Sequence, residues 1–176
     1  MKQLLRITWL ALLATSVAAQ APKATNSLDF DNGSKISVSF RQINVAEGVT
    51  IKTLMAEGEE GDNYRKYFND QGFTNAIGGT MKLNETSEIN GNLLDSGSYR
   101  LTFRIDEDRI WYLVILTKKD EEVVSIVLDV TEDEENASKR LGLRPTATNN
   151  RKAEGNLAIR FGSMTASVPF RTGVKG

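Results

Sequence analysis

The stretch "SGSYRLTFRIDEDRIWYLVIL", residues Ser96 to Leu116, constrains the fold of this chain more than any other. Apolar and polar side chains alternate in its first half, so that one face would carry Tyr99, Leu101, Phe103 and Ile105. A period of two residues is typical of a β-strand with one buried face. The charged "DEDR" then predicts a hairpin loop, and "IWYLVILT" predicts the returning strand.

The returning strand is apolar at every position from Ile110 to Leu116. A strand with one solvated face would alternate, so this strand must be covered on both faces. One cover is the opposing sheet. The other is left open between a helix around Tyr64–Phe68, the long loop before it, and a second subunit, with a ligand groove beside Trp111 as a further option. In each of the first three cases Trp111 is mostly buried.

The rest of the chain predicts short strands separated by turns, about nine or ten in all. Asp31-Asn32-Gly33 joins two of them, because Asn-Gly readily adopts the positive φ angles of tight hairpins. The second of these two, "KISVSFR", alternates apolar and polar residues, which predicts one buried face. Pro145 should end a weak strand, and Pro169 favours an edge strand. We therefore expect an all-β fold, an antiparallel β-sandwich, with residues 28–172 as a single domain.

One short helix is predicted in "DNYRKYFNDQG". Asp62 can cap it, and Gly72 can end it. Tyr64, Tyr67 and Phe68 would share one face. A parallel α/β fold would need several helices between strands, and only this one is predicted.

The first twenty residues resemble a secretory signal peptide. Lys2 and Arg6 precede an apolar run and then small residues. Val17 and Ala19 suit positions −3 and −1, which places cleavage before Gln20 and the signal peptide at residues 1–19. Cleavage after Ala21 is the alternative. The apolar run is shorter than the about 20 residues that span a bilayer. We expect a periplasmic or secreted protein with no transmembrane segment after cleavage.

Polar tails are expected at both ends of the mature chain, at residues 20–27 and 173–176. Without Lys2 and Arg6 the chain has 20 basic and 23 acidic residues, a formal net charge of −3. This balance gives no electrostatic reason to expect nucleic acid or anionic lipid partners.

The chain contains no Cys and no His. This excludes disulfides, Ser-His-Asp and Cys-His catalytic groups, and zinc sites with thiolate or imidazole ligands. Carboxylate, Lys, Tyr or Ser chemistry and oxygen-ligated cations remain. No cofactor is predicted.

Two sets of side chains are candidate binding residues. Arg41, Arg100 and Arg104 could form a row on outward strand faces, with Lys82 nearby, and hold a carboxylate or sugar acid. The alternative is ordinary charge that discourages sheet aggregation. Tyr64, Tyr67 and Trp111 could form a sugar-stacking surface, or be buried in the core.

Acidic clusters at Asp106–Asp108 and Asp129–Glu135 lack the ligand spacing of a calcium loop, so we interpret them as solvated loops and predict no metal site. Asn84 and Asn136 begin glycan acceptor patterns, which carry little weight in a protein of bacterial type.

Three stretches resemble the bacterial family of unknown function numbered 2911, whose members are mostly exported single all-β domains. They are "KISVSFRQ", "LNETSEINGNLLDSGSYRLTFRIDEDRIWYLVIL" and "LAIRFGSMTASVPF". The family's Trp-Arg pair and Gly-Ala-Asn have no clear counterpart in "YFNDQGFTNAIGGT", where Thr80 matches its Thr. The resemblance implies fold and export, and it brings no activity.

The sequence favours an exported, non-catalytic binding or interaction module. Its partner would be a protein or a small-molecule or glycan ligand, with a homodimer as an option. The alternative is a secreted glycan or ester hydrolase that uses paired carboxylates. Two acids converging in a concave, aromatic-lined cleft would favour that alternative.

Overall fold

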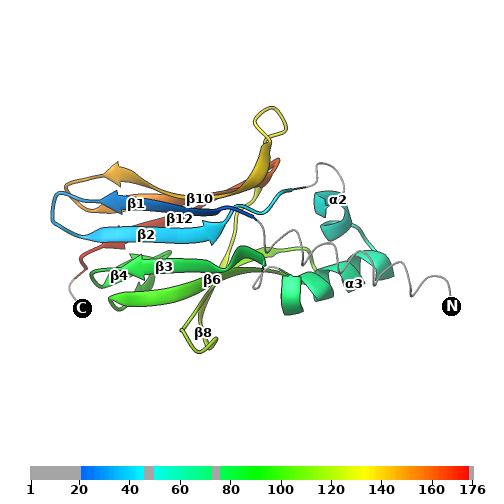
Figure 1. Cartoon of the computed structure of the whole chain (residues 1–176), viewed down its shortest axis with the longest axis horizontal. Coiled ribbons are helices and arrows are strands. Elements are labelled where there is room, and N and C mark those ends of the chain that lie inside the picture. Colours follow the sequence, from blue (N-terminus) through cyan, green and yellow to red (C-terminus); the bar gives the residue numbers. More distant parts are fainter. Residues whose placement is uncertain (1–20, 46–49, 73–75, 175–176) are drawn as a thin grey trace.

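The computed structural model describes residues 21–45, 50–72 and 76–174 of the 176-residue chain. These residues form two antiparallel sheets packed face to face, with two short α-helices at one end (Figure 1). The predicted all-β sandwich is therefore confirmed. The described residues hold twelve strands, more than the nine or ten expected, because strands of two or three residues leave little pattern in a sequence. The proposed signal peptide lies outside the described residues.

Each sheet has one main path of hydrogen-bonded strands. The first sheet has the order β1 (Lys23–Asp29), β2 (Lys35–Arg41), β3 (Gly79–Leu83), β6 (Gly97–Ile105), β7 (Trp111–Leu116) and β8 (Glu122–Val127). The second sheet has the order β10 (Ser138–Asn149), β11 (Glu154–Gly162), β12 (Met164–Thr172), β4 (Ser87–Ile89) and β5 (Asn92–Leu94). The two-residue strand β9 (Thr131–Glu132) pairs with β12.

The inner faces of the two sheets form one hydrophobic core. The alternation predicted for the second strand of the chain is confirmed, because Ile36, Val38 and Phe40 are buried there. The same holds for β6, where Leu101, Phe103 and Ile105 are buried. Between β4 and β5, Asn90 and Gly91 both have positive φ, which is the type I′ hairpin geometry that Asn-Gly favours.

One prediction about the N-terminal tail is wrong. Residues from Lys23 onward belong to β1, which pairs with β2 along its whole length. Ala24 and Leu28 pack against the core, and the Asn26 side chain donates a 2.7 Å hydrogen bond to the Leu143 carbonyl. The polar composition therefore conceals a strand at the sheet edge. At the other end, Val174 N–H donates to the Thr86 carbonyl, so the described part of that tail is also bonded.

Both proline predictions need correction. Strand β10 continues through Pro145 to Asn149. Leu143 directs its carbonyl away from β11 to Asn26, and so Pro145, two residues on, directs its nitrogen to the same side and breaks no ladder bond. Pro169 lies in β12, an interior strand. It falls between the β9 and β4 pairings, and its carbonyl accepts from Asn90 N–H.

The helical segment is longer than predicted. It contains α2 (Thr50–Leu54), α3 (Glu59–Tyr67) and a π-helical turn (Phe68–Gly72), which ends at the predicted glycine. Helix α3 begins three residues before Asp62, which makes no cap and instead pairs with Arg65. None of the helices in the described ranges is both long and apolar enough to span a membrane.

Candidate functional site

The predicted arginine row lies on the outer face of the first sheet, but its members are engaged. Arg100 forms an ion pair with Asp120, and Arg104 bonds to Glu122 at 3.2 Å and to Ser125 Oγ at 3.0 Å. Arg41 lies on β2, and β3 separates it from β6. The three arginines therefore form no joint binding row.

Tyr112 completes the polar network around Arg104. The Arg104 guanidinium lies 5.1 Å from the centre of the Tyr112 ring, as in a cation–π contact. The Tyr112 hydroxyl donates a 2.9 Å hydrogen bond to Asp106. This bond raises the pKa of the Tyr112 phenol, and desolvation adds to the effect. The network thus holds a neutral tyrosine in a fixed position.

This network also explains how β7 is covered on its outer face. Val114 and Leu116 point outward, yet both are buried. Ser125 pairs with Val114 and Glu122 with Leu116, so the Arg104 side chain crosses the outer side of β7 to reach its partners. Long arginine stems bury apolar surface in this way. The outer cover is therefore side chains of the same sheet rather than a helix or subunit.

The prediction that Trp111 is buried is confirmed. It is 6% exposed and points into the core. Its ring lies 6.0 Å from that of Phe161, and its indole N–H donates to the Met55 sulfur at 3.3 Å. Met55 follows α2, so the predicted long loop supplies part of the cover.

Tyr64, Tyr67 and Trp111 form no joint sugar-stacking surface. Tyr64 is half-buried on α3, where its ring lies 5.7 Å from that of Phe68. Burial raises the pKa of the Tyr64 phenol. Tyr67 is also only partly exposed, and Trp111 faces the core. Of the three candidates, Trp111 belongs to the core and Tyr64 packs against it.

A small cavity lies between the sheets beside Trp111. It is lined by Phe103, Trp111, Leu128, Val130, Leu141, Ile159, Phe161, Met164, Thr165 and Ala166. Its volume is about 20 Å³, little more than one water molecule needs. The lining is almost entirely apolar and contains no carboxylate. The cavity is too small for a ligand unless side chains move.

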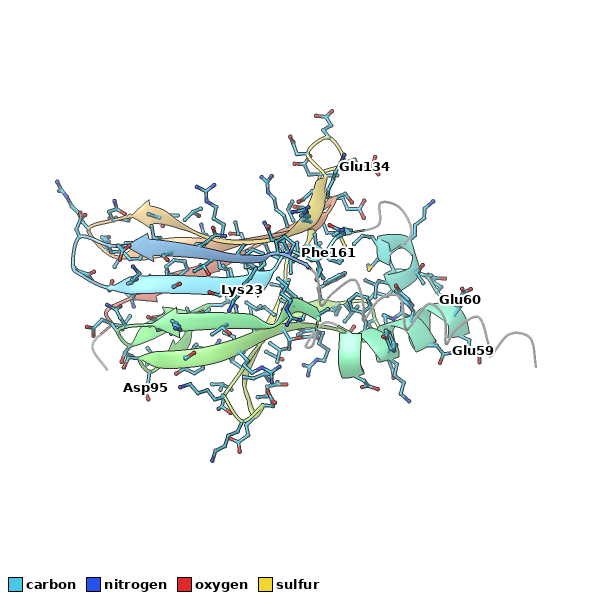
Figure 2. The ribbon with its side chains drawn as sticks, viewed as in Figure 1. Lys23, Glu59, Glu60, Asp95, Glu134 and Phe161 are labelled. Carbon is cyan, nitrogen blue, oxygen red and sulfur yellow. The ribbon has the colours of Figure 1, made fainter. Side chains whose placement is uncertain are left out.

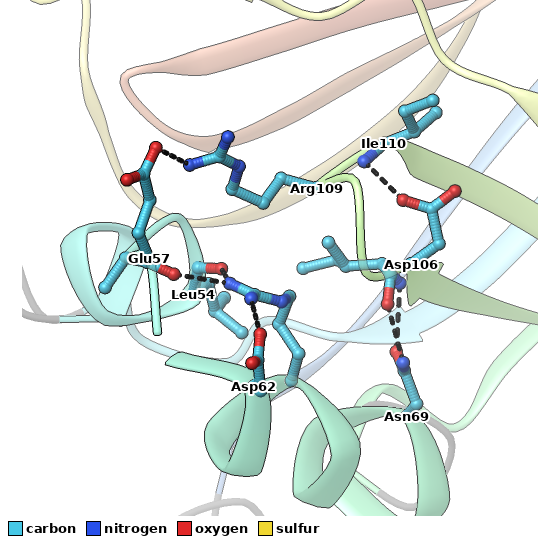
Figure 3. A network of polar contacts seen from close by, with 10 residues as sticks. Leu54, Glu57, Asp62, Asn69, Asp106, Arg109 and Ile110 are labelled. Atoms are coloured by element: carbon cyan, nitrogen blue, oxygen red, sulfur yellow. Dashed lines mark hydrogen bonds and ion pairs between the residues drawn. The ribbon is translucent and has the colours of Figure 1, made fainter. Parts of the chain in front are cut away.

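A polar network joins the two helices to the sandwich (Figure 3). Asn69 bonds to both backbone groups of Ile105, accepting at 2.9 Å and donating at 2.6 Å. Arg109, in the β6–β7 loop, donates to Glu57 at 2.8 Å. This bond lowers the pKa of the Glu57 carboxyl. The network fixes the position of the helices.

The acidic loops show structural roles. Asp106 accepts from Ile110 N–H and closes the β6–β7 loop. Asp133 bonds to Asn136 within the β9–β10 loop, which projects from the sandwich and carries Glu134 (Figure 2). Among the described residues no group of three or more acidic side chains is placed to hold a metal ion. Asn84 uses both side-chain atoms to bond to Gly33 and Lys35.

The outer face of the second sheet carries a different arginine group. Arg140 and Arg144 lie on β10, and Arg160 lies on β11 directly opposite Gly142. We call Arg140, Arg144 and Arg160 the arginine triad. All three are exposed, and their side chains form no hydrogen bond or ion pair with any described residue.

The surroundings of the triad leave it accessible. Leu141 and Leu143 alternate with its members and point into the core. Diagonal neighbours on adjacent strands have side chains about 7–8 Å apart, which applies to Arg144 and Arg160. Gly142 contributes no side chain, and Ala158 lies opposite Arg144. The residues directly opposite Arg144 and Arg160, Ala158 and Gly142, are therefore too small to cover the guanidinium groups.

Comparisons of the chain with family models, curated proteins and solved structures gave no match.

Proposed function

We propose that this chain is an exported, non-catalytic binding module, and that the arginine triad binds an acidic glycan. The observation that supports this proposal is the presence of three exposed, unpaired arginines on one face of the second sheet. Of the seven other described arginines, five form an ion pair with an acid. The triad is thus a local basic surface on a chain of acidic balance.

An explanation of such charges that needs no ligand is protection of a sheet edge against aggregation. It applies to Arg144, because β10 is an edge strand of the second sheet. At Arg140 the segment of residues 43–45 already bonds to this edge. The explanation does not apply to Arg160, which lies on the interior strand β11 between β10 and β12. A ligand for the triad accounts for all three positions.

The shape of the surface indicates the ligand class. Guanidinium groups bind carboxylates through two parallel hydrogen bonds. Small molecules are usually bound in concave pockets, which a sheet face does not provide. An extended polymer with repeated carboxylates can instead lie across the face and meet the three arginines in turn. Acidic polysaccharides have this chemistry, and an exported protein would encounter them.

Each contact should be weak. An exposed ion pair contributes about 0–1 kcal/mol, so a single sugar acid would bind poorly. A polymer presents many carboxylates at high local concentration, which raises the apparent affinity. Because the contacts are exposed, binding should weaken as ionic strength rises.

The first test is retardation of the mature protein in a native gel that contains polygalacturonate. We expect retardation that added salt abolishes, and none with neutral dextran. Gly142→Glu places a carboxylate among the arginines and should weaken binding by about tenfold or more. An added Cβ at Gly142 meets its nearest neighbour, Arg160 Cβ, at an ordinary 3.8 Å, so the side chain fits.

Gly142→Gln is the matched control, because it has the same shape and no charge. It should bind as the parent does. Equal binding by the Glu and Gln variants would show that the triad is not the site. Retardation by polyglutamate but not by polygalacturonate would replace the glycan with an acidic peptide as the ligand.

The hydrolase alternative would need two facing carboxylates in a concave site. The acids nearest the predicted arginine row, Asp120 and Glu122, are each bonded to an arginine. The Trp111 cavity has no acid in its lining. No observation therefore favours catalysis over binding.

Export is part of the proposal and has its own test. It rests on the charged, apolar and small-residue order of residues 1–19 and on the resemblance to family 2911. The intact mass of protein recovered from the periplasm or medium should correspond to a chain that begins near Gln20. Recovery of the full-length chain from the membrane fraction would contradict it.

A further inference from the structure

Strand β8 is an open edge of the first sheet. It pairs with β7 on one side, and among the described residues no backbone group pairs with its other side. The opposite edge, β1, lies against β10 and bonds to it through Asn26. Natural edge strands are commonly protected by Lys or Pro. The sequence of β8, "EVVSIV", contains neither, and its one charged residue, Glu122, and its irregular register with β7 both lie at its start.

The free backbone groups of β8 can be assigned from its register. Leu128 N–H donates to the Trp111 carbonyl, so it points toward β7. Directions alternate along a strand, so Ile126 and Val124 also point toward β7. The N–H and carbonyl groups of Ser125 and Val127 therefore point away from β7, toward the open edge of the sheet.

The exposed apolar side chains of β8 are placed symmetrically. Val123 is 43% exposed and Val127 is 59% exposed, and they make up two of the four large exposed hydrophobic residues in the described chain. Each lies two residues from Ser125. An antiparallel copy of the same strand, centred on Ser125, would therefore place Val123 of each subunit against Val127 of the other.

We propose that the protein forms a homodimer by antiparallel pairing of β8 with β8 of a second copy, centred on Ser125. When the same surface of two subunits pairs with itself, the result is a closed two-fold dimer, and no surface is left to bind a third copy. The register with β7 is regular from Val124 to Val127 and shifts between Val124 and Glu122, so the pairing spans only Val123 to Val127. The interface is therefore short, and the dimer should dissociate on dilution.

The hairpin that carries β8 is accessible. In Figure 1 it extends past the neighbouring strands at the edge of the sandwich. The two-fold axis of an antiparallel strand pair is perpendicular to the sheet, so both second sheets would lie on the same side of the joined first sheets. The two arginine triads would then face the same direction. The dimer itself does not depend on the triad binding a ligand.

Cross-linking gives a direct test, because the chain has no Cys. In the proposed pairing Ser125 faces Ser125 of the partner subunit in a hydrogen-bonded pair, with Cα atoms about 5.5 Å apart, which a disulfide can span. Ser125→Cys should form a disulfide dimer more than about tenfold faster than Leu93→Cys, owing to its high local concentration. Leu93 is a matched control because it is 59% exposed and lies on β5.

Sedimentation of the mature protein over a wide concentration range gives the second test. The parent should show a reversible monomer–dimer equilibrium. Val127→Lys should raise the dissociation constant by about tenfold or more, because the symmetry places the added charge at the interface twice. Leu93→Lys should have no effect. A parent that stays monomeric, or equal cross-linking of the two cysteine variants, would overturn the proposal.

Discussion

Replacing Trp111 with alanine is expected to lower the free energy of unfolding by about 3–5 kcal/mol. The side chain is 6% exposed and lies between Phe161 and Met55. Its removal would enlarge a cavity of about 20 Å³ that already lies beside it, and the neighbouring side chains would lose contact atoms. The loss is a large fraction of the stability of a typical domain.

Urea denaturation of the mature protein, followed by far-ultraviolet circular dichroism, measures this loss. Leu93→Ala is the control, because a side chain 59% exposed should contribute no more than about 0.5 kcal/mol. Trp9 leaves with the proposed signal peptide, so the fluorescence of the parent reports Trp111 alone. A red-shifted, easily quenched emission from the folded parent would contradict the burial on which the prediction rests.

The core was predictable from local pattern. Strands with one solvated face alternate in sequence, and this identified the inward residues of β2 and β6. The all-apolar β7 was correctly interpreted as covered on both faces. The nature of its outer cover was not predictable. It depends on Arg104 reaching Ser125 and Glu122, and these residues are neighbours only once β7 and β8 have paired.

The sheet edges were less predictable. Strand β1 is polar on its solvated face and only weakly apolar inside, so its composition is that of a tail. Pro145 indicated a strand end because the direction of each backbone nitrogen is unknown from sequence. Once β10 is an edge strand with that nitrogen facing outward, proline is compatible with it.

For the candidate site, the directions of side chains were predictable from the sequence, but the contacts between strands were not. The outward direction of Arg100 and Arg104 followed from alternation, but their ion pairs with Asp120 and Glu122 required the β6–β7–β8 register. The arginine triad had a signal in the alternation of "RLGLR" and "AIRF". Its clustering could not be seen before Arg160 was known to lie opposite Gly142.

The burial of Arg65 and its role in holding the two helices together could not be predicted from the sequence. It stands beside Lys66 in a charged helix, yet it is 4% exposed whereas Lys66 is exposed. Its guanidinium donates to the Leu54 carbonyl at 2.7 Å and to the Ala56 carbonyl at 2.8 Å, and it also pairs with Asp62. These bonds tie the end of α2 to α3 (Figure 3).

Gly61 shows how closely α3 approaches the segment that connects it to α2. A Cβ at this position would lie 2.1 Å from the Ala56 carbonyl oxygen. The backbone therefore leaves little room for water to replace the guanidinium. A buried carbonyl without a donor costs about 1–3 kcal/mol. Arg65 serves the Leu54 carbonyl in a buried bond and the Ala56 carbonyl in a partly buried one.

Arg65→Ala is therefore expected to destabilise the protein by about 2–4 kcal/mol, within the cost of two unsatisfied carbonyls. Lys66→Ala, one residue away and exposed, should change stability by no more than about 0.5 kcal/mol. Arg65→Lys should fall between them, because Nη1 donates to both carbonyls while Nη2 pairs with Asp62, and a single ammonium nitrogen cannot occupy both positions. Urea denaturation followed by Trp111 fluorescence measures the global effect, and amide hydrogen exchange in α2 and α3 detects a loss confined to the helices. Equal stability and equal exchange in the Arg65→Ala and Lys66→Ala variants would show that water satisfies the two carbonyls and that Arg65 does not join the helices.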